Sequence, residues 1–170
     1  MKTVLFFLLF PLLAFAQVLG DPVALTQRTF NAKSVEQQNI ILSEAQVQQL
    51  MKASQQPIET KIYRVYSAKN DSKTLGYGVL LNKKVRTKTA IALYLIDMSG
   101  KIKSIEIVAF NEPIEYLPSK TWLDGFDNKS SANTLKLNQD IPTTTGATLS
   151  ARAITDGARI ALSLIDIAKP

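Results

Sequence analysis

The sequence of 170 residues contains no cysteine and no histidine. Without cysteine, the chain forms no disulfide, offers no thiolate nucleophile and supplies no ligand for an iron–sulfur cluster. Without histidine, it has no Ser-His-Asp machinery, no imidazole general base and no histidine ligand for zinc or haem. We therefore expect no metal or haem and no catalytic residue in this chain. Any redox chemistry then has to come from a borrowed organic cofactor.

The excess of positive charge is also small, with 20 Lys and Arg residues against 14 Asp and Glu residues. The basic residues are scattered along the chain, apart from the run Lys83-Lys84-Val85-Arg86-Thr87-Lys88. A scattered excess is typical of a solvated surface, whereas a nucleic-acid interface gathers its basic residues on one face. We therefore expect no nucleic-acid partner.

The N-terminal residues 1–16 have the order of a secretory signal peptide. Lys2 is followed by a mainly apolar run over residues 3–13, and Ala14-Phe15-Ala16 supplies small residues at the two positions that a signal peptidase reads. The run is shorter than the ~20 apolar residues of a membrane-spanning helix, which makes an uncleaved anchor the weaker alternative. We predict cleavage before Gln17, with Gly20 as the second choice. The mature chain would be periplasmic or otherwise exported.

The mature chain is predicted to contain an N-terminal arm and helix over residues 17–60 and a domain over residues 61–170. From Gln17 to about Leu42 the pattern is polar and irregular, which predicts an arm without well-specified structure. Ser43 and Gln46 then form a capping box, which favours a helix that begins here. This helix should end before Pro57, because the residue before a proline disfavours the helical conformation.

Four segments of the domain are predicted to be strands. They lie at residues 61–66, 75–81, 87–97 and 101–107 and are rich in β-branched, aromatic and aliphatic residues. The last segment alternates apolar and polar residues and follows a turn at Ser99-Gly100. These features predict an antiparallel meander with one covered face.

The rest of the domain is predicted to add helices to this sheet. Pro118-Ser119 precedes a short helix that carries Trp122, a further strand is expected near Thr134–Leu137, and an apolar stripe predicts a long helix that ends near Ala168. The predicted fold is therefore α+β, with an antiparallel sheet, helices packed on one side and a long C-terminal helix.

The segment Thr143–Ser150 carries the most specific chemical signal. It places four threonines and the turn residue Gly146 at the start of the long helix. Unpaired backbone N–H groups and the positive end of the helix dipole favour an anion such as phosphate at this position. The alternative is that Thr145 or Thr148 only caps the helix, since threonine is a favoured cap residue. Spacing alone leaves both interpretations open.

The segment Thr145–Ser150 resembles the [Ser/Thr]-Gly-Ala-Thr-x-[Ser/Thr] signature of the FMN-binding domain family, which occurs in the C subunit of the sodium-pumping NADH:quinone reductase and the G subunit of the Rnf complex. The resemblance extends over about residues 62–168 and includes Gly76-Tyr77-Gly78. It implies that FMN is the cofactor and that a flavin transferase joins FMN through its phosphate to Thr148. The neighbouring residues that it assigns to the cofactor site are Thr145, Gly146, Ala147, Leu149 and Ser150.

Three further residues are candidates for the flavin site. Glu112 lies in the segment that takes the place of the Glu-Thr-Pro-Gly loop of the respiratory-complex subunits. Tyr116 and Trp122 have rings that could stack on a flavin, although aromatic residues also often belong to the core. The sequence departs from many family members six residues before Thr148, where Pro142 stands in place of aspartate.

We therefore expect an exported electron-transfer flavoprotein of bacterial type, not an enzyme with its own turnover site. Its expected partners are the flavin transferase and a membrane or periplasmic redox partner. The alternative from another class is a secreted binding module that holds FMN or another phosphorylated ligand non-covalently. A third interpretation is an exported accessory subunit with an empty site.

Overall fold

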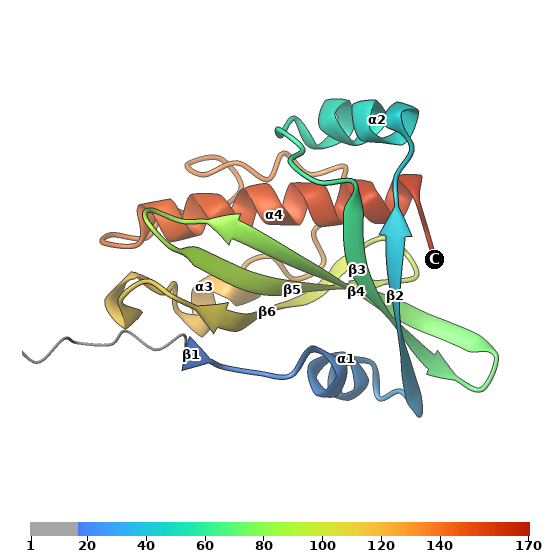
Figure 1. The fold of residues 1–170 in the computed structure, drawn as a ribbon. Helices are drawn as coiled ribbons and strands as arrows, with labels where there is room; N and C mark the ends of the chain where they lie inside the picture. Colours follow the sequence, from blue (N-terminus) through green and yellow to red (C-terminus); the bar gives the residue numbers. More distant parts are fainter. Residues whose placement is uncertain (1–16) are drawn as a thin grey trace, which may run out of the picture.

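The computed structural model describes residues 17–170, so the predicted signal peptide at residues 1–16 lies outside the described residues. An antiparallel sheet with the strand order β1-β6-β5-β4-β3-β2 forms the centre of the molecule (Figure 1). Its strands are β1 (Gln17–Val18), β2 (Ser34–Ile41), β3 (Ile62–Asn70), β4 (Lys73–Lys84), β5 (Thr89–Asp97) and β6 (Ile102–Phe110).

Helices cover both faces of this sheet. They are α1 (Pro22–Phe30), α2 (Glu44–Ser54), the short 3₁₀ helix η1 (Ile114–Tyr116), α3 (Lys120–Asp124) and α4 (Thr148–Ile167). Figure 1 shows α4 lying along one face with α2 packed beyond it, while α1 lies on the opposite face. No helix within residues 17–170 combines the length and the apolar character needed to cross a membrane.

The main core lies between the sheet and α4. Tyr94 of β5 is completely buried there, and its hydroxyl donates a hydrogen bond of 3.0 Å to the backbone oxygen of Ile154. Gly157 of α4 lies directly over the Tyr94 ring, where an added Cβ would overlap the phenol. The glycine in this helix is therefore explained by close packing between α4 and β5.

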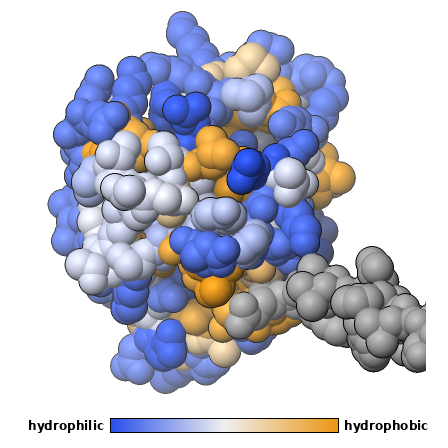
Figure 2. Space-filling model, turned by 90° about the vertical axis from the view of Figure 1, so that its left-hand side faces the viewer, coloured by the Kyte–Doolittle hydropathy of each residue, from blue (hydrophilic) through white to orange (hydrophobic). Residues whose placement is uncertain are grey.

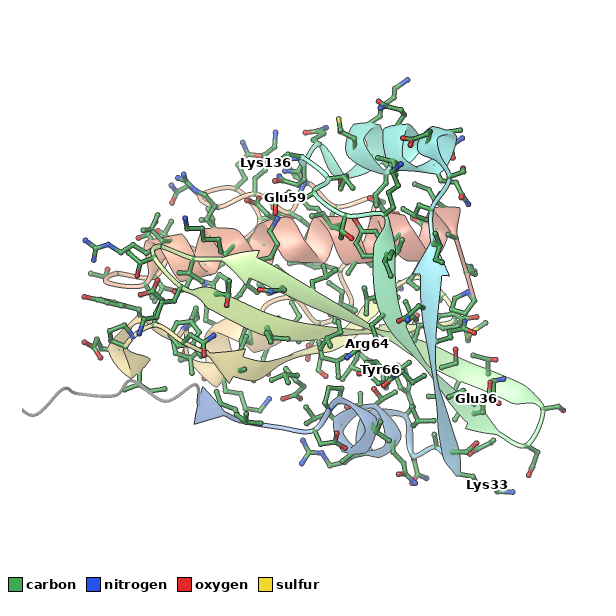
Figure 3. The ribbon with its side chains drawn as sticks, in the orientation of Figure 1. Lys33, Glu36, Glu59, Arg64, Tyr66 and Lys136 are labelled. Atoms are coloured by element: carbon green, nitrogen blue, oxygen red, sulfur yellow. The ribbon has the colours of Figure 1, made fainter. Side chains whose placement is uncertain are left out.

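A smaller core lies between the sheet and α1. Here Tyr66, Leu93, Leu95 and Val108 are buried together, and Phe30 of α1 packs against them. In Figure 3, Tyr66 lies on this side of the sheet. Because β5 also contributes Tyr94 to the main core, the prediction of one covered face is wrong.

The predicted irregular arm is corrected by the structure. Asp21 accepts a hydrogen bond of 2.8 Å from the backbone N–H of Ala24, and Pro22 opens α1 at a position where proline is favoured. The helix fits onto β4 because Gly76 has no side chain at the place occupied by the Phe30 ring. Strand β2 then pairs with β3 along its full length. Helix α1 therefore lies on the face of the sheet opposite α4, which contradicts the prediction that the helices pack on one side.

The strand expected near Thr134–Leu137 is also absent within the described residues. Only an isolated bridge joins Leu137 to Ile141. The carboxylate of Asp140 accepts hydrogen bonds from the backbone N–H groups of Leu135 and Lys136, both at 2.8 Å, and so folds this segment back on itself. Local side-chain bonding of this kind competes with strand pairing.

The other predicted elements are confirmed, including the α+β class with its antiparallel sheet and long C-terminal helix. Helix α2 begins with the predicted capping box, in which Ser43 Oγ accepts from the N–H of Gln46 at 3.3 Å and Gln46 Oε1 accepts from the N–H of Ser43 at 3.0 Å. Helix α3 begins after Ser119 as expected. The division into residues 17–60 and 61–170 remains a prediction, although β2 joins the same sheet as β3.

Candidate functional site

The threonine-rich loop ends in a turn that leads into α4. Gly146 has a φ of +81°, and the N–H of Ala147 donates a hydrogen bond of 3.2 Å to the backbone oxygen of Thr144. Ala147 is the N-cap residue of α4, and no side chain of the described residues 17–170 caps this helix. By contrast, Asp21, Ser43 and Ser119 cap α1, α2 and α3. The longest helix therefore presents its first N–H groups without a side-chain acceptor.

Thr148 does not act as the cap. Its hydroxyl donates to the backbone oxygen of Thr144 at 3.3 Å, and its side chain is exposed. Thr145 is exposed too, and makes no capping bond. The interpretation that one of these threonines only caps α4 is therefore wrong.

The turn at Gly146 can be tested directly. A Cβ added at Gly146 would meet nothing within 4 Å, so any cost of substitution comes from its positive φ. We expect Gly146→Ala to lower the free energy of unfolding by about 1–2 kcal/mol, the usual cost of a left-handed L-residue. Chemical denaturation would measure this loss. Gly146→Asn should cost less, since asparagine tolerates this conformation, and equal costs for both variants would contradict the explanation.

A cavity of about 170 Å³ lies beside the start of α4. Three segments distant in sequence form it, namely the β4–β5 loop, the segment at η1 and the first residues of α4. Its lining residues are Val85, Arg86, Glu112, Tyr116, Gly146, Ala147, Thr148, Leu149 and Ser150. In Figure 1 these three segments lie together at the left end of the molecule, and Figure 2 shows this end as a mixture of pale, hydrophilic and hydrophobic surface.

Ser150 is the most informative residue of the cavity wall. It is 1% exposed, and its Oγ has no hydrogen-bond partner within the described residues. A buried hydroxyl without a partner costs roughly 1–3 kcal/mol. A polar ligand in the cavity would remove this cost, so Ser150 is an independent indication of a binding site next to the uncapped end of α4.

Glu112 organises the opposite wall. Its Oε1 accepts hydrogen bonds from three consecutive backbone N–H groups, at 3.2 Å from Arg86, 2.6 Å from Thr87 and 2.8 Å from Lys88. The N–H groups of Lys88 and Thr87 are the main cause that holds the pKa of Glu112 below its ordinary value. The carboxylate therefore faces the β4–β5 loop and is occupied by it.

This carboxylate gives a pH-dependent signal. A lowered pKa in the folded state means that the stabilisation by Glu112 is present above its ordinary value of about 4.3 and is lost as the pH falls through the lower, folded-state pKa. We expect the amide proton shifts of Thr87 and Lys88 to titrate together, with a midpoint below about 4.3. NMR titration would measure this, and Glu112→Gln should remove the transition. A midpoint above the ordinary value would contradict the described hydrogen bonds.

The two aromatic candidates occupy different positions. Tyr116 is half-buried and lines the cavity. Trp122 is not one of the lining residues: its ring packs edge-on against Phe126 at 5.2 Å, and its Nε1 donates a hydrogen bond of 2.7 Å to the backbone oxygen of Pro142. Trp122 therefore fixes the start of the threonine-rich loop, while Tyr116 is positioned to contact a ligand.

Sequence reasoning missed Val85 and Arg86 as cavity residues. Both belong to the basic run at residues 83–88, to which the sequence analysis assigned no role, and the structure brings them against the start of α4. A second cavity of about 320 Å³ shares Thr148 with the first and contains Lys136, Arg152 and Arg159. Thr148 thus stands between two hollows, and basic side chains contribute to both.

A comparison with protein families found a similarity over part of the chain. Residues 86–163 match the model of the FMN-binding domain. Over this range the chain is similar to the FMN-binding domain family. The matched range contains all residues of the first cavity except Val85, from Arg86 at its start to Ser150. A search of curated proteins found no match to the sequence.

The cofactor of an FMN-binding domain is FMN, and the cavity fits parts of this molecule. The uncapped N–H groups of α4 and the hydroxyl of Ser150 suit its phosphate, whereas Val85, Leu149 and Tyr116 offer apolar and aromatic surface. Pockets that enclose a drug-sized ligand have volumes of roughly 300–1,000 Å³. Since this cavity is smaller, FMN would remain partly exposed to solvent.

Proposed function

We propose that this FMN-binding domain is an exported electron-transfer flavoprotein that carries FMN linked through its phosphate to Thr148. The observation that carries the proposal is the combination at the start of α4. Within residues 17–170, the exposed hydroxyl of Thr148 stands at a helix end without a side-chain cap, two residues before Ser150, whose buried hydroxyl has no hydrogen-bond partner. A phosphodiester retains one negative charge, which such a helix end stabilises.

The linkage requires an activated phosphate, because direct esterification of FMN would have to expel water. FAD is a donor of this kind, since its flavin-side phosphate is joined to AMP. The Thr148 oxygen forms a bond to this phosphorus, the bond to the AMP phosphate breaks, AMP leaves and the hydroxyl proton is released. Thr148 is accessible to a transferase because its side chain is exposed.

The role of an electron carrier is favoured by the shape and chemistry of the site. The first cavity is too small to enclose the cofactor together with a substrate. Its carboxylate, Glu112, is occupied by the backbone of the β4–β5 loop. When bound, FMN supplies the electron-transfer chemistry that the chain lacks, and the residues around it bind and orient the cofactor.

Co-expression with a flavin transferase tests the proposal. Intact-mass measurement of the purified protein should show a gain of one FMN less one water, and the yellow colour should survive denaturing electrophoresis. Protein produced without the transferase is the control and should lack this mass. If colour is bound but lost on unfolding, the domain is instead a non-covalent FMN-binding module.

Export is part of the same proposal and has its own test. Cleavage before Gln17 would leave β1 complete, so that it can pair with β6, whereas cleavage before Gly20 would remove β1. N-terminal sequencing of protein recovered from the exported fraction should therefore begin at Gln17. Mature protein that retains Met1 would contradict export by cleavage, and a start at Gly20 would contradict the position.

A further inference from the structure

We propose that Arg86 binds the phosphate of FMN and that Glu112 is a positioning residue that holds Arg86 at the cavity. The inference rests on the proposed function in one respect, namely that the phosphate lies at the start of α4. It adds a cationic group from a different part of the chain. It also gives Glu112 a role that involves no contact with the cofactor.

The β4–β5 loop owes its conformation to Glu112. The N–H of Val85 donates to the backbone oxygen of Lys88 at 2.9 Å and closes the turn. The three N–H groups inside this turn all point to one carboxylate oxygen of Glu112, an arrangement in which successive backbone N–H groups enclose an anion. Residues 86–88 are otherwise exposed, so Glu112 is the buried anchor of an exposed loop.

Arg86 is the cation that this loop brings to the cavity. Glu112 accepts a hydrogen bond from the backbone N–H of Arg86, not from its guanidinium. Within residues 17–170 no carboxylate forms an ion pair with the Arg86 side chain. The guanidinium is thus available to a ligand in the cavity that Arg86 lines together with Thr148 and Ser150. A guanidinium group can donate two parallel hydrogen bonds to the oxygens of one phosphate, so phosphate is the ligand group that suits Arg86 best.

The same loop offers a matched control. Lys88 is exposed and carries the same charge two residues away, but it does not line the cavity. General attraction of an anion would be weakened similarly by removing either charge. A direct contact with phosphate would be weakened by removing Arg86 alone.

Binding of FMN and riboflavin to the protein made without transferase tests this proposal, because riboflavin lacks the phosphate. We expect Arg86→Gln to weaken FMN binding by about tenfold or more, the effect of losing one charge-assisted contact, and to leave riboflavin binding unchanged. Arg86→Lys should restore part of the loss. Lys88→Gln should change FMN binding by less than about twofold, as expected of an exposed charge.

The role of Glu112 is tested in the same assay. Glu112→Gln should weaken FMN binding without affecting riboflavin, and should add little to the loss in an Arg86→Gln background, because both changes remove one contact. Equal losses for riboflavin would show that Glu112 touches the flavin itself and would overturn its positioning role.

An unchanged FMN affinity of Arg86→Gln, an equal effect of Lys88→Gln, or no FMN binding by the folded wild-type protein would overturn the role of Arg86. Since no covalent bond is measured, failure of the Thr148 linkage would appear separately, as a missing mass.

Discussion

A Thr148→Ala variant produced together with the flavin transferase is expected to carry no covalent flavin. The substitution removes the hydroxyl that forms the phosphodiester and leaves the helix end in place. Among the described residues 17–170, the side-chain hydrogen bond lost is the exposed one from Thr148 to the backbone oxygen of Thr144. We expect the free energy of unfolding to fall by less than about 1 kcal/mol, because an exposed bond contributes little and alanine is the better helix former. Intact mass and chemical denaturation measure the two effects.

Two neighbouring variants sharpen this experiment. Thr148→Ser retains a hydroxyl and should retain some of the covalent mass. Thr145→Ala removes an equally exposed hydroxyl three residues earlier and should leave labelling intact, since Thr145 does not line the first cavity. One FMN on Thr148→Ala would refute the assignment. Clean loss of label on folded Thr145→Ala would move the attachment to Thr145.

The elements with strong local signals were predictable from the sequence. The capping box at Ser43 and Gln46, the alternation over residues 101–107 and the apolar stripe of α4 each agree with the structure. In such segments, the local hydrogen bonds and the tertiary packing favour the same conformation. The prediction of a helix start at the TGATLS segment was correct for the same reason, because α4 begins at Thr148.

The N-terminal part was harder to predict, for two different reasons. Asp21 and Pro22 form a recognisable helix start, so α1 had a local signal that the surrounding polar residues obscured. Strand β2 had no such signal, because it lies at the edge of the sheet and most of its side chains are exposed. Its conformation follows from pairing with β3, a long-range contact that no periodicity in residues 34–41 reveals.

The residues of the candidate site also fall into two groups, those that the sequence places together and those that only the fold brings together. Thr148 and Ser150 lie within one contiguous motif, and the sequence places them together at a helix end. Arg86 and Glu112 reach the same cavity from a hairpin loop and from the segment after β6, so only the fold shows that they are neighbours. The family resemblance suggested Glu112 as a cofactor residue, but the hydrogen bonds from the backbone of the β4–β5 loop to its carboxylate depend on the fold and cannot be read from the sequence.

The largest stability effect is expected from Gly157→Val, where the helix meets Tyr94. The added side chain would overlap the phenol hydroxyl and ring, and Tyr94 cannot move aside because it is completely buried. Overpacking of a core costs about 1–3 kcal/mol, and this site should lie at the upper end because α4 or β5 has to shift. Replacing a helical glycine gains at most about 1 kcal/mol, so the steric cost decides the sign.

Thermal unfolding of Gly157→Val in two backgrounds tests this explanation. Each kcal/mol lost should lower the Tm by about 2–4 °C for a domain of this size. Tyr94→Phe removes the hydroxyl nearest to the added Cβ, together with the bond to the Ile154 oxygen, and alone should cost about 0.5–1.5 kcal/mol. In this background, Gly157→Val should cost less than in the wild type, because part of the overlap is gone. Purely additive costs would show that the Tyr94 hydroxyl does not set the distance between α4 and the sheet, and that another contact of this helix requires the glycine.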